Sequence, residues 1–312
     1  MVKAFSKFLF LAILFFANLV FSKPLTLALN WKAEPEFGGF YTAQLEGIYK
    51  KHGLDVKILE GGSGTPTVQM LANGKVDFAI VSADEIIISQ ERNPKNKLKA
   101  VFSVYHTSPH IILTHAEKNY SSIKDVFASK DTLAVQSGLP YYQWLVKTLG
   151  KPQAKVVPFT GGIAHFLNDK NFAQQGFITT ELLAAEKTGA KVKHFLIADA
   201  GYNPYLVVLA VRESLLKEKP ELVKKLVQAV REGWEGYLKD PTKTNAEIAK
   251  LNKAFDPEIL EKAAEIQKPL IQSPASPLGS MTPERWNTLT EQLKSIGLIK
   301  AAPEASSLFE NL

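Results

Sequence analysis

The chain has 312 residues, of which 46% are hydrophobic and 22% are charged, and it contains no cysteine. This composition is typical of a globular protein with a sizeable core, and it excludes disulfides, thiolate metal sites and cysteine nucleophiles. The net charge is +6 without any dense block of lysine and arginine, so the charge does not indicate a nucleic-acid partner. The length suits one large domain or two domains of ordinary size.

The first 22 residues have the pattern of a secretory signal peptide. Lys3 and Lys7 provide a positive start, and Ser22 is a small residue at the expected cut. The apolar stretch from Phe8 to Phe21 has 14 residues and contains Asn18, whereas a membrane span needs about 20. We therefore expect this leader to be removed, which lowers the net charge to +4, and the mature protein to be periplasmic.

Strand-like and helix-like segments alternate after the leader. The strand-like segments of the first part are 25–29, 54–59 and 76–81, and helical spacing occurs between them at 45–49 and 68–71. Such alternation, with nearly continuous apolar strands, predicts mostly parallel sheets covered by helices on both faces. Two further apolar runs, 100–105 and 111–114, are separated by a short turn, where we expect the chain to cross between domains.

The same rhythm returns in the second part and gives way to purely helical sequence. A helix is predicted at 140–149, and strands are predicted at 132–136, 156–159, 176–178, 192–197 and 206–211. From Pro220 onward the pattern is helical. We therefore predict an α/β fold of two lobes around a cleft, with a C-terminal helical segment. Lobe 1 is predicted to comprise residues 23–104 and 206–312, and lobe 2 residues 105–205.

Ligands of open α/β sheets bind beyond the carboxyl ends of the strands, so the residues after each strand form the candidate site. After the first strand, aromatic faces with polar tips suit a flat ring, and the candidates are Asn30, Trp31, Phe37, Gly38 and Tyr41. The loop after the second strand offers N–H groups and hydroxyls to an acceptor or an anion, and its candidates are Gly62, Ser63, Gly64 and Thr65. A plain helix-start turn explains Thr65 equally well.

Two carboxylates follow the third strand. Asp84 is expected to cap the next helix, whereas Glu85, close to Ser82, is the candidate acceptor for amino groups of a ligand. The corresponding positions of the second lobe are Gln136, Ser137, Tyr141, Thr160 and Glu181. Tyr105 and Tyr202, near the two points where the lobes join, complete the candidate site.

Three histidines, His106, His110 and His115, lie close together in the sequence. A zinc site needs three or four ligands that converge on one point, but in a strand His115 would face away from the other two. Neither cysteine nor an H-E-x-x-H motif is present. We therefore expect no metal site and no cofactor.

Five segments of the first half resemble the NMT1/THI5-like (SsuA/THI5) family of substrate-binding proteins of ABC importers. They are Leu27–Trp31, Gly38–Gln44, Gly47–Val56, Gly61–Thr67 and Asn73–Ala79. The resemblance covers essentially the mature chain and is looser in lobe 2. It implies a type II periplasmic binding fold that closes on a small solute and delivers it to an ABC permease in the inner membrane. We expect the protein to be a monomer.

The family implies several possible solutes, namely thiamine pyrimidine precursors, alkanesulfonates, taurine and nitrate. The Asn30–Trp31 pair and Glu85 resemble the pyrimidine-precursor branch, in which a ring would stack on Trp31 and an amino group would meet the carboxylate. Binding of a sulfonate or another small anion is the alternative. The yeast-type pyrimidine synthases are an enzymatic branch with a cysteine-rich motif and a lysine that binds pyridoxal phosphate. Because this chain has no cysteine, we expect a binding protein and not an enzyme.

Overall fold

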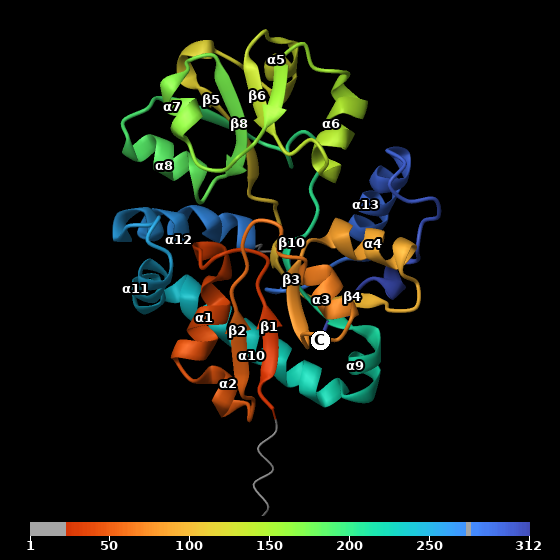
Figure 1. Cartoon of the computed structure of the whole chain (residues 1–312). Coiled ribbons are helices and arrows are strands. Elements are labelled where there is room, and N and C mark those ends of the chain that lie inside the picture. The colour runs from red at the N-terminus through yellow and green to blue at the C-terminus, as the bar shows by residue number, and fades with distance from the viewer. Residues whose placement is uncertain (1–22, 273–275) are drawn as a thin grey trace, which may run out of the picture.

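The computed structural model describes residues 23–272 and 276–312, so the expected signal peptide lies outside the described residues. Two five-stranded sheets form two lobes, one above the other in Figure 1. The lobe 1 sheet has the order β2-β1-β3-β10-β4, with β1 at Leu25–Ala28, β2 at Val56–Leu59, β3 at Phe78–Val81, β4 at Leu98–Tyr105 and β10 at Leu206–Arg212. The lobe 2 sheet has the order β7-β6-β8-β5-β9, with β5 at His110–His115, β6 at Thr132–Val135, β7 at Lys155–Pro158, β8 at Phe172–Phe177 and β9 at Val192–Leu196.

Both sheets are mixed, whereas the sequence predicts mostly parallel ones. In lobe 1, β1 is parallel to β2 and β3, but β10 is antiparallel to β3 and β4. In lobe 2, β6 is parallel to β7 and β8, but β5 is antiparallel to β8 and β9. The strands β5 and β10 are the ones that enter a lobe from the other lobe. They run away from the junction, whereas the parallel strands run towards it and end there.

Helices cover both faces of each sheet (Figure 1). Those of lobe 1 are η1 (Pro35–Phe37), α1 (Gly38–Leu45), α2 (Ile48–Lys51), α3 (Thr67–Ala72), α4 (Ala83–Arg92), α9 (Glu213–Glu218), α10 (Pro220–Lys239), α11 (Thr242–Leu251), α12 (Pro257–Ile271), α13 (Pro283–Ser295) and η3 (Ala305–Ser307). Those of lobe 2 are η2 (Ala116–Lys118), α5 (Ile123–Ala128), α6 (Pro140–Leu149), α7 (Ala164–Asn168) and α8 (Glu181–Lys187). In the described part of the chain, no helix has the length and apolar character needed to cross a membrane.

Alternate residues of β3 face opposite sides of the lobe 1 sheet, and both sides are packed. Phe78 and Ile80 lie in a core cluster with residues of α1 and α10. Ala79 and Val81 lie in a second cluster with residues of α3, α4 and α13. A strand buried on both faces explains why its sequence is continuously apolar instead of alternating.

Glycines allow α1 and α10 to approach each other closely. A Cβ atom on Gly39 would lie 2.2 Å from the ring of Trp234, and a Cβ atom on Gly233 would lie 2.3 Å from the carbonyl oxygen of Gly39. Because side chains other than hydrogen do not fit there, the two helices are held in one position. This contact also fixes η1, which directly precedes α1.

The strand β8 is longer than the sequence predicts, because buried polar side chains interrupt its apolar pattern. The prediction began at Gly176, whereas the strand begins at Phe172 and includes Gln174 and Gln175. Gln175 is buried because its side-chain oxygen accepts hydrogen bonds from the hydroxyl of Tyr141 at 2.5 Å and from a backbone N–H of lobe 2.

Two connections join the lobes, at residues 106–109 and 197–205, and Arg285 on α13 binds both. Its guanidinium donates hydrogen bonds to the carbonyl oxygen of His106 in the first connection and to that of Asn203, at 2.8 Å, in the second. The guanidinium also lies over the ring of Tyr205, 3.9 Å from its centre. We infer that the lobes divide within these two connections.

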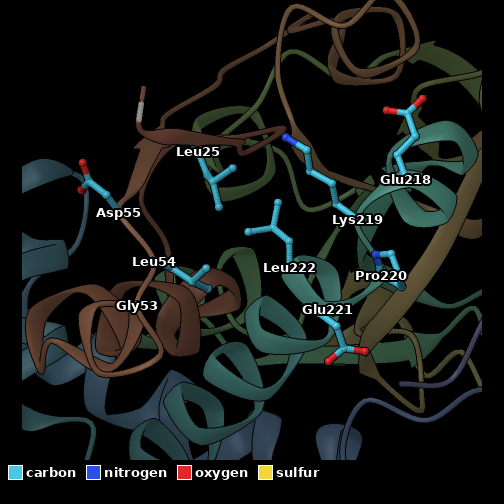
Figure 2. A pocket seen from close by; sticks show the side chains of 9 residues that line it. All are labelled: Leu25, Gly53, Leu54, Asp55, Glu218, Lys219, Pro220, Glu221 and Leu222. Atoms are coloured by element: carbon cyan, nitrogen blue, oxygen red, sulfur yellow. The ribbon is translucent and has the colours of Figure 1, made fainter. Parts of the chain in front are cut away.

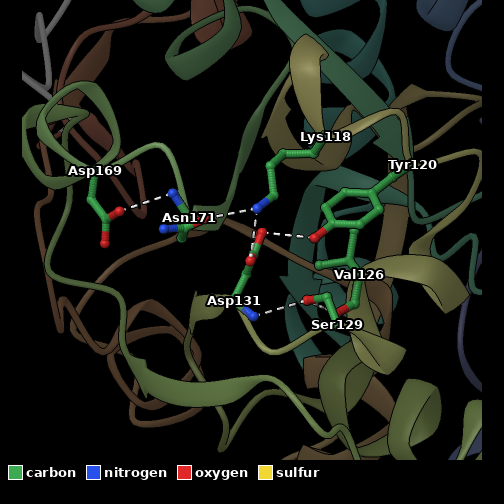
Figure 3. Close-up of polar contacts among 7 residues, drawn as sticks. All are labelled: Lys118, Tyr120, Val126, Ser129, Asp131, Asp169 and Asn171. Atoms are coloured by element: carbon green, nitrogen blue, oxygen red, sulfur yellow. Dashed lines mark hydrogen bonds and ion pairs between the residues drawn. The ribbon is translucent and has the colours of Figure 1, made fainter.

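A polar cluster holds together the end of lobe 2 that is remote from lobe 1 (Figure 3). Asp131 precedes β6, and its carboxylate accepts hydrogen bonds from the ammonium of Lys118 at 2.9 Å and from the hydroxyl of Tyr120 at 2.7 Å. Lys118 also donates to the side-chain oxygen of Asn171 at 2.8 Å. One carboxylate thus joins the start of β6 to the segment that follows β5.

Replacement of Asp131 by alanine should lower the free energy of unfolding by about 2 kcal/mol, because it leaves an ammonium and a hydroxyl without their partner. Asp131→Asn, which keeps the shape, should cost less. Chemical denaturation measures both changes. Glu117→Ala is the control, because the Glu117–Lys170 pair is exposed and should contribute less than about 0.5 kcal/mol. Equal losses for Asp131→Ala and Glu117→Ala would contradict this account of the cluster.

Candidate functional site

A cavity of about 340 Å³ lies between the two lobes. Its walls include residues that directly follow the central parallel strands, such as Asn30 after β1, Ser82 after β3 and Gln136 after β6. Both connections between the lobes contribute, with Ser108 from the first and Tyr202 from the second. The cavity has the size and position that small-molecule sites of α/β proteins usually have.

Several residues that the sequence analysis selected line this cavity. They are Asn30, Trp31, Phe37, Ser82, Glu85, Gln136, Tyr141, Glu181 and Tyr202. They come from both lobes, so the structure brings together candidates that are up to 172 residues apart in the chain.

The other selected residues do not line the cavity. They are Gly38, Tyr41, Gly62, Ser63, Gly64, Thr65, Tyr105, Ser137 and Thr160. The loop after β2 lies to one side because β2 is an edge strand, and this accounts for residues 62–65. After β7, Phe159 lines the cavity, whereas the next residue, Thr160, does not. Gly38 is packed against the ring of Tyr237, and the hydroxyl of Tyr105 donates to the side-chain oxygen of Gln267 at 2.6 Å.

The charge of the cavity is one-sided. Five carboxylates line it, and no lysine or arginine is found among the described lining residues. The carboxylates are Glu34, Glu36, Asp84, Glu85 and Glu181. A carboxylate in a confined space without a cation is costly in its ionised form, so the cavity favours ligands that bring hydrogen-bond donors or positive charge.

The two carboxylates that follow β3 both line the cavity, but they have different hydrogen-bond partners. Ser82 is the N-cap of α4, and the carboxylate of Glu85 completes the cap by accepting the N–H of Ser82 at 2.9 Å. Asp84 is buried, and it accepts hydrogen bonds from the hydroxyls of Ser82 and, at 3.1 Å, of Tyr202. Burial raises the pKa of both carboxyl groups, and the charge of Asp84 raises that of Glu85 further.

Glu34, Glu36 and Glu181, here called the interlobe carboxylates, face one another from different lobes. Glu34 and Glu36 belong to the turn that forms η1 in lobe 1, and Glu181 begins α8 in lobe 2. The hydroxyl of Thr179, also in lobe 2, donates a hydrogen bond to Oε1 of Glu36. Glu36 therefore contacts lobe 2 directly, although its backbone belongs to lobe 1.

Glu34 and Glu36 hold protons more strongly than exposed carboxyl groups do. Burial raises the pKa of Glu36 to about 7, opposed by the hydrogen bond from Thr179 and assisted by the charge of Glu181. The pKa of Glu34 is raised well above its usual value, first by burial and then by the charges of Glu36 and Glu181. Near neutral pH the carboxyl group of Glu36 therefore readily exchanges its proton.

Two apolar side chains remain exposed in the cavity wall, one on each lobe. Trp31 of lobe 1 and Leu139 of lobe 2 are both 39% exposed. The indole Nε1 of Trp31 donates a hydrogen bond to Oε1 of Glu34 at 3.0 Å, which fixes the orientation of the ring. A flat molecule between the lobes could cover both surfaces at once.

His110 is a lining residue that the sequence analysis did not select. Its ring stacks on Phe177 with centres 5.2 Å apart and meets the ring of Tyr141 at 4.4 Å. Burial lowers the pKa of His110 to about 4, so the imidazole is neutral. Its Nε2 atom is buried and has no hydrogen-bond partner, which leaves it available to a ligand.

Other lining residues were also missed, above all Glu34, Glu36, Asp84 and Gln175. A signal existed for the first two, because two glutamates lie within four residues before Gly38 in a segment that follows a strand. Gln175 was hidden because it lies inside a strand instead of after one.

A second cavity, of about 440 Å³, lies at the end of lobe 1 remote from lobe 2 (Figure 2). Figure 2 shows Leu25 and Leu222 at its centre, whereas the carboxylates of Asp55, Glu218 and Glu221 point in different directions at its edge. Polar groups that converge on one point are what fixes a ligand in a site, and this cavity lacks such an arrangement among its described residues. In the described ranges, no group of three or more histidine, aspartate or glutamate side chains is placed to hold a metal ion.

Comparison with known proteins gives a family and a fold. The model of the family described as NMT1/THI5 like matches residues 34–244. A riboflavin-binding protein, RibY, of Chloroflexus aurantiacus is 23% identical over 92% of this chain and 84% of its own length. A formylaminopyrimidine-binding protein of Halalkalibacterium halodurans is 22% identical over 91% of this chain and 88% of its own length.

Enzymes also match this chain. A 4-amino-5-hydroxymethyl-2-methylpyrimidine phosphate synthase of Saccharomyces cerevisiae is 23% identical over 70% of this chain and 68% of its own length.

Among solved structures, the periplasmic aliphatic sulphonate binding protein SsuA of Escherichia coli superposes on this chain with a TM-score of 0.72. The match covers 93% of each chain, and the two sequences are 12% identical. The likeness to SsuA confirms the predicted periplasmic binding protein fold.

The raised pKa of Glu36 predicts how the stability of the ligand-free protein depends on pH. A carboxyl group whose pKa is higher in the folded than in the unfolded state stabilises the fold at low pH, and this contribution is lost as pH rises through about 7. Between about pH 5 and pH 8, Glu36→Gln should therefore gain stability relative to the wild type, by on the order of 3 kcal/mol. Chemical denaturation at the two pH values measures the change, with the exposed Glu235→Gln as control. If the free energies of unfolding of Glu36→Gln and the wild type differ by the same amount at both pH values, the prediction is wrong.

Proposed function

The chain belongs to the NMT1/THI5-like family, and we propose that it is the solute-binding component of an ABC importer that captures a small aromatic solute bearing amino groups. One observation carries the proposal: the cavity between the lobes combines an exposed indole with five carboxylates and has no lysine or arginine among its described lining residues. Binding proteins for riboflavin and for formylaminopyrimidine, which align with most of this chain, support the binding role.

Trp31 is the proposed platform for the ring of the solute. More than a third of this large side chain is exposed in the ligand-free cavity, although aromatic residues of this size usually bury most of their surface. Its Nε1 is held by Glu34, so little side-chain freedom remains to be lost on binding. Leu139 and Pro140 line the lobe 2 side and would cover the other face of the ring.

The carboxylates are the proposed partners of the amino groups. An amino group that donates to a buried carboxylate makes a charge-assisted hydrogen bond, which is stronger than a neutral one. Among solutes of this kind we propose a thiamine pyrimidine precursor of the hydroxymethylpyrimidine type. In its support, the related binding protein and the related yeast synthase are both named after substituted aminopyrimidines.

The charge of the cavity argues against the alternative of a sulfonate or another small anion. An anion needs donors or cations around it, and its approach to five carboxylates without a cation among the described lining residues would be repulsive. The loop 61–67, which the sequence analysis offered as an anion site, does not line the cavity. The likeness to a sulphonate-binding protein concerns the fold.

We propose that the protein binds its solute without converting it. In the enzymatic branch that the sequence analysis considers, a lysine holds pyridoxal phosphate. No lysine for such a linkage and no arginine for the phosphate are found among the described residues of the cavity wall, so these residues do not fit that cofactor. The absence of cysteine, which the motif of that branch requires, points the same way.

The place and partners of the protein follow from this proposal. The leader-like first 22 residues and the fold support a periplasmic monomer that delivers its solute to a permease in the inner membrane. The connections at 106–109 and 197–205 would act as the hinge.

A thermal-shift panel tests the class of solute. 4-Amino-5-hydroxymethyl-2-methylpyrimidine should raise the melting temperature, because a ligand at 100 times its Kd stabilises the folded state by about 2.7 kcal/mol. Ethanesulfonate and taurine should leave it unchanged. A shift with the sulfonates alone would favour the anion alternative, and turnover of the pyrimidine, followed by mass spectrometry, would refute a purely binding role.

Trp31→Ala should weaken binding of the same pyrimidine by about 10- to 100-fold, because stacking of a base on an aromatic ring contributes about 1–3 kcal/mol. Isothermal titration calorimetry measures the change. Trp31→Phe, which keeps an aromatic face, should recover most of the loss. Unchanged affinity in Trp31→Ala would show that the ring does not rest on this side chain.

A further inference from the structure

The interlobe carboxylates leave one hydrogen-bonding position empty. Glu34 receives the indole N–H of Trp31, and Oε2 of Glu181 receives the N–H of Phe177 at 2.8 Å and the hydroxyl of Thr180 at 2.5 Å. Oε1 of Glu36 receives the hydroxyl of Thr179. Oε2 of Glu36 has no partner, although only 4% of this residue is exposed.

A buried oxygen without a donor is costly unless something supplies one. Glu36 lines the cavity, so a donor could reach it from a molecule bound there. The nearby side chains do not provide that donor. Tyr105 and Tyr237, which lie close enough to interact electrostatically with Glu36, donate their hydroxyls instead to Gln267 and to Asn245.

Negative charge converges on the same place from both lobes. Glu34 stands beside Glu36, and Glu181 faces them from lobe 2. Lys32 lies close enough to attract Glu34, but it is exposed and does not line the cavity. A basic nitrogen with an N–H would both satisfy the empty oxygen and reduce the repulsion among the three carboxylates.

We propose that Glu36, supported by Glu34 and Glu181, is the specificity-determining group of the cavity and recognises a basic, N–H-bearing edge of the solute, such as an amino group beside a ring nitrogen. The assignment rests on the proposed function and moves the recognition of the amino group away from Glu85, which completes the cap of α4. A solute held by Glu36 and Glu181 contacts both lobes at once.

A pair of matched ligands tests the proposal. One is 4-amino-5-hydroxymethyl-2-methylpyrimidine, and the other is its 4-oxo analogue, in which an acceptor replaces the donor. The wild type should bind the amino compound about 100-fold more tightly, as expected for a charge-assisted hydrogen bond against an unpaired buried carboxylate. Isothermal titration calorimetry gives both constants, and circular dichroism confirms that each variant is folded.

Three isosteric variants separate the roles of the glutamates. Glu36→Gln should lose most of the preference for the amino compound, by about 10- to 100-fold, and Glu181→Gln should lose part of it. Glu181→Gln keeps an oxygen for its two donors and so provides a second test if Glu36→Gln does not fold. The exposed Glu235→Gln is the control and should behave as the wild type.

The possible failures are distinct. If the wild type prefers the amino compound and both Glu36→Gln and Glu181→Gln keep that preference, Glu36 does not recognise the amino group, and the proposed function stands without it. If the wild type binds the two pyrimidines equally, no residue of the cavity selects for the amino group and the inference is wrong. If it binds neither, the proposed function fails together with the inference.

Discussion

The carboxylates in the cavity between the lobes, which have no lysine or arginine beside them among the described lining residues, determine which ligands the cavity favours. Five carboxylates line it, and no lysine or arginine is found among the described lining residues. Burial and mutual repulsion raise the pKa of Glu34 and Glu36, so the closer the lobes approach, the more strongly these groups need protons or donors. The cavity therefore contains buried polar atoms that the folded chain alone does not satisfy, among them Oε2 of Glu36 and Nε2 of His110. A ligand with N–H groups completes it, whereas an anion aggravates the imbalance.

The sequence predicted the positions of most strands and, through the rule that ligands bind at strand ends, half of its candidate site residues. The rule succeeded for the central strands β1, β3 and β6, whose ends supply Trp31, Ser82 and Gln136. It failed for the loop after β2 because β2 is an edge strand, and the order of strands in a sheet depends on pairing between distant segments. Local sequence carries no information about that pairing. The burial of Asp84 has a similar cause, since its partner Tyr202 is distant in the sequence.

The residues that surround the cavity are tightly packed and hydrogen-bonded, unlike the polar groups inside it. The core of lobe 1 is packed on both faces of the sheet, glycines let α1 and α10 touch, and Arg285 ties the two connections to α13. Burial lowers the pKa of Arg285 to about 10, yet its guanidinium is fully occupied by carbonyl oxygens and an aromatic ring. Rigid surroundings of this kind let a few unsatisfied groups persist, because the packing energy of the whole lobe outweighs their cost.

The last residues of the chain complete the first lobe. The N–H of Ala100 in β4 donates to the carbonyl of Leu308, and the N–H of Glu310 donates back to Ala100, each at 2.9 Å. The N–H of Ser103 donates to Gly279 at 3.0 Å. Because ribosomes synthesise proteins from the amino end, β4 lacks these neighbours until residues 279–310 have been synthesised. Lobe 2, whose strands come from one continuous stretch, can form earlier. We therefore expect lobe 2 to fold before the sheet of lobe 1 has gained these backbone contacts.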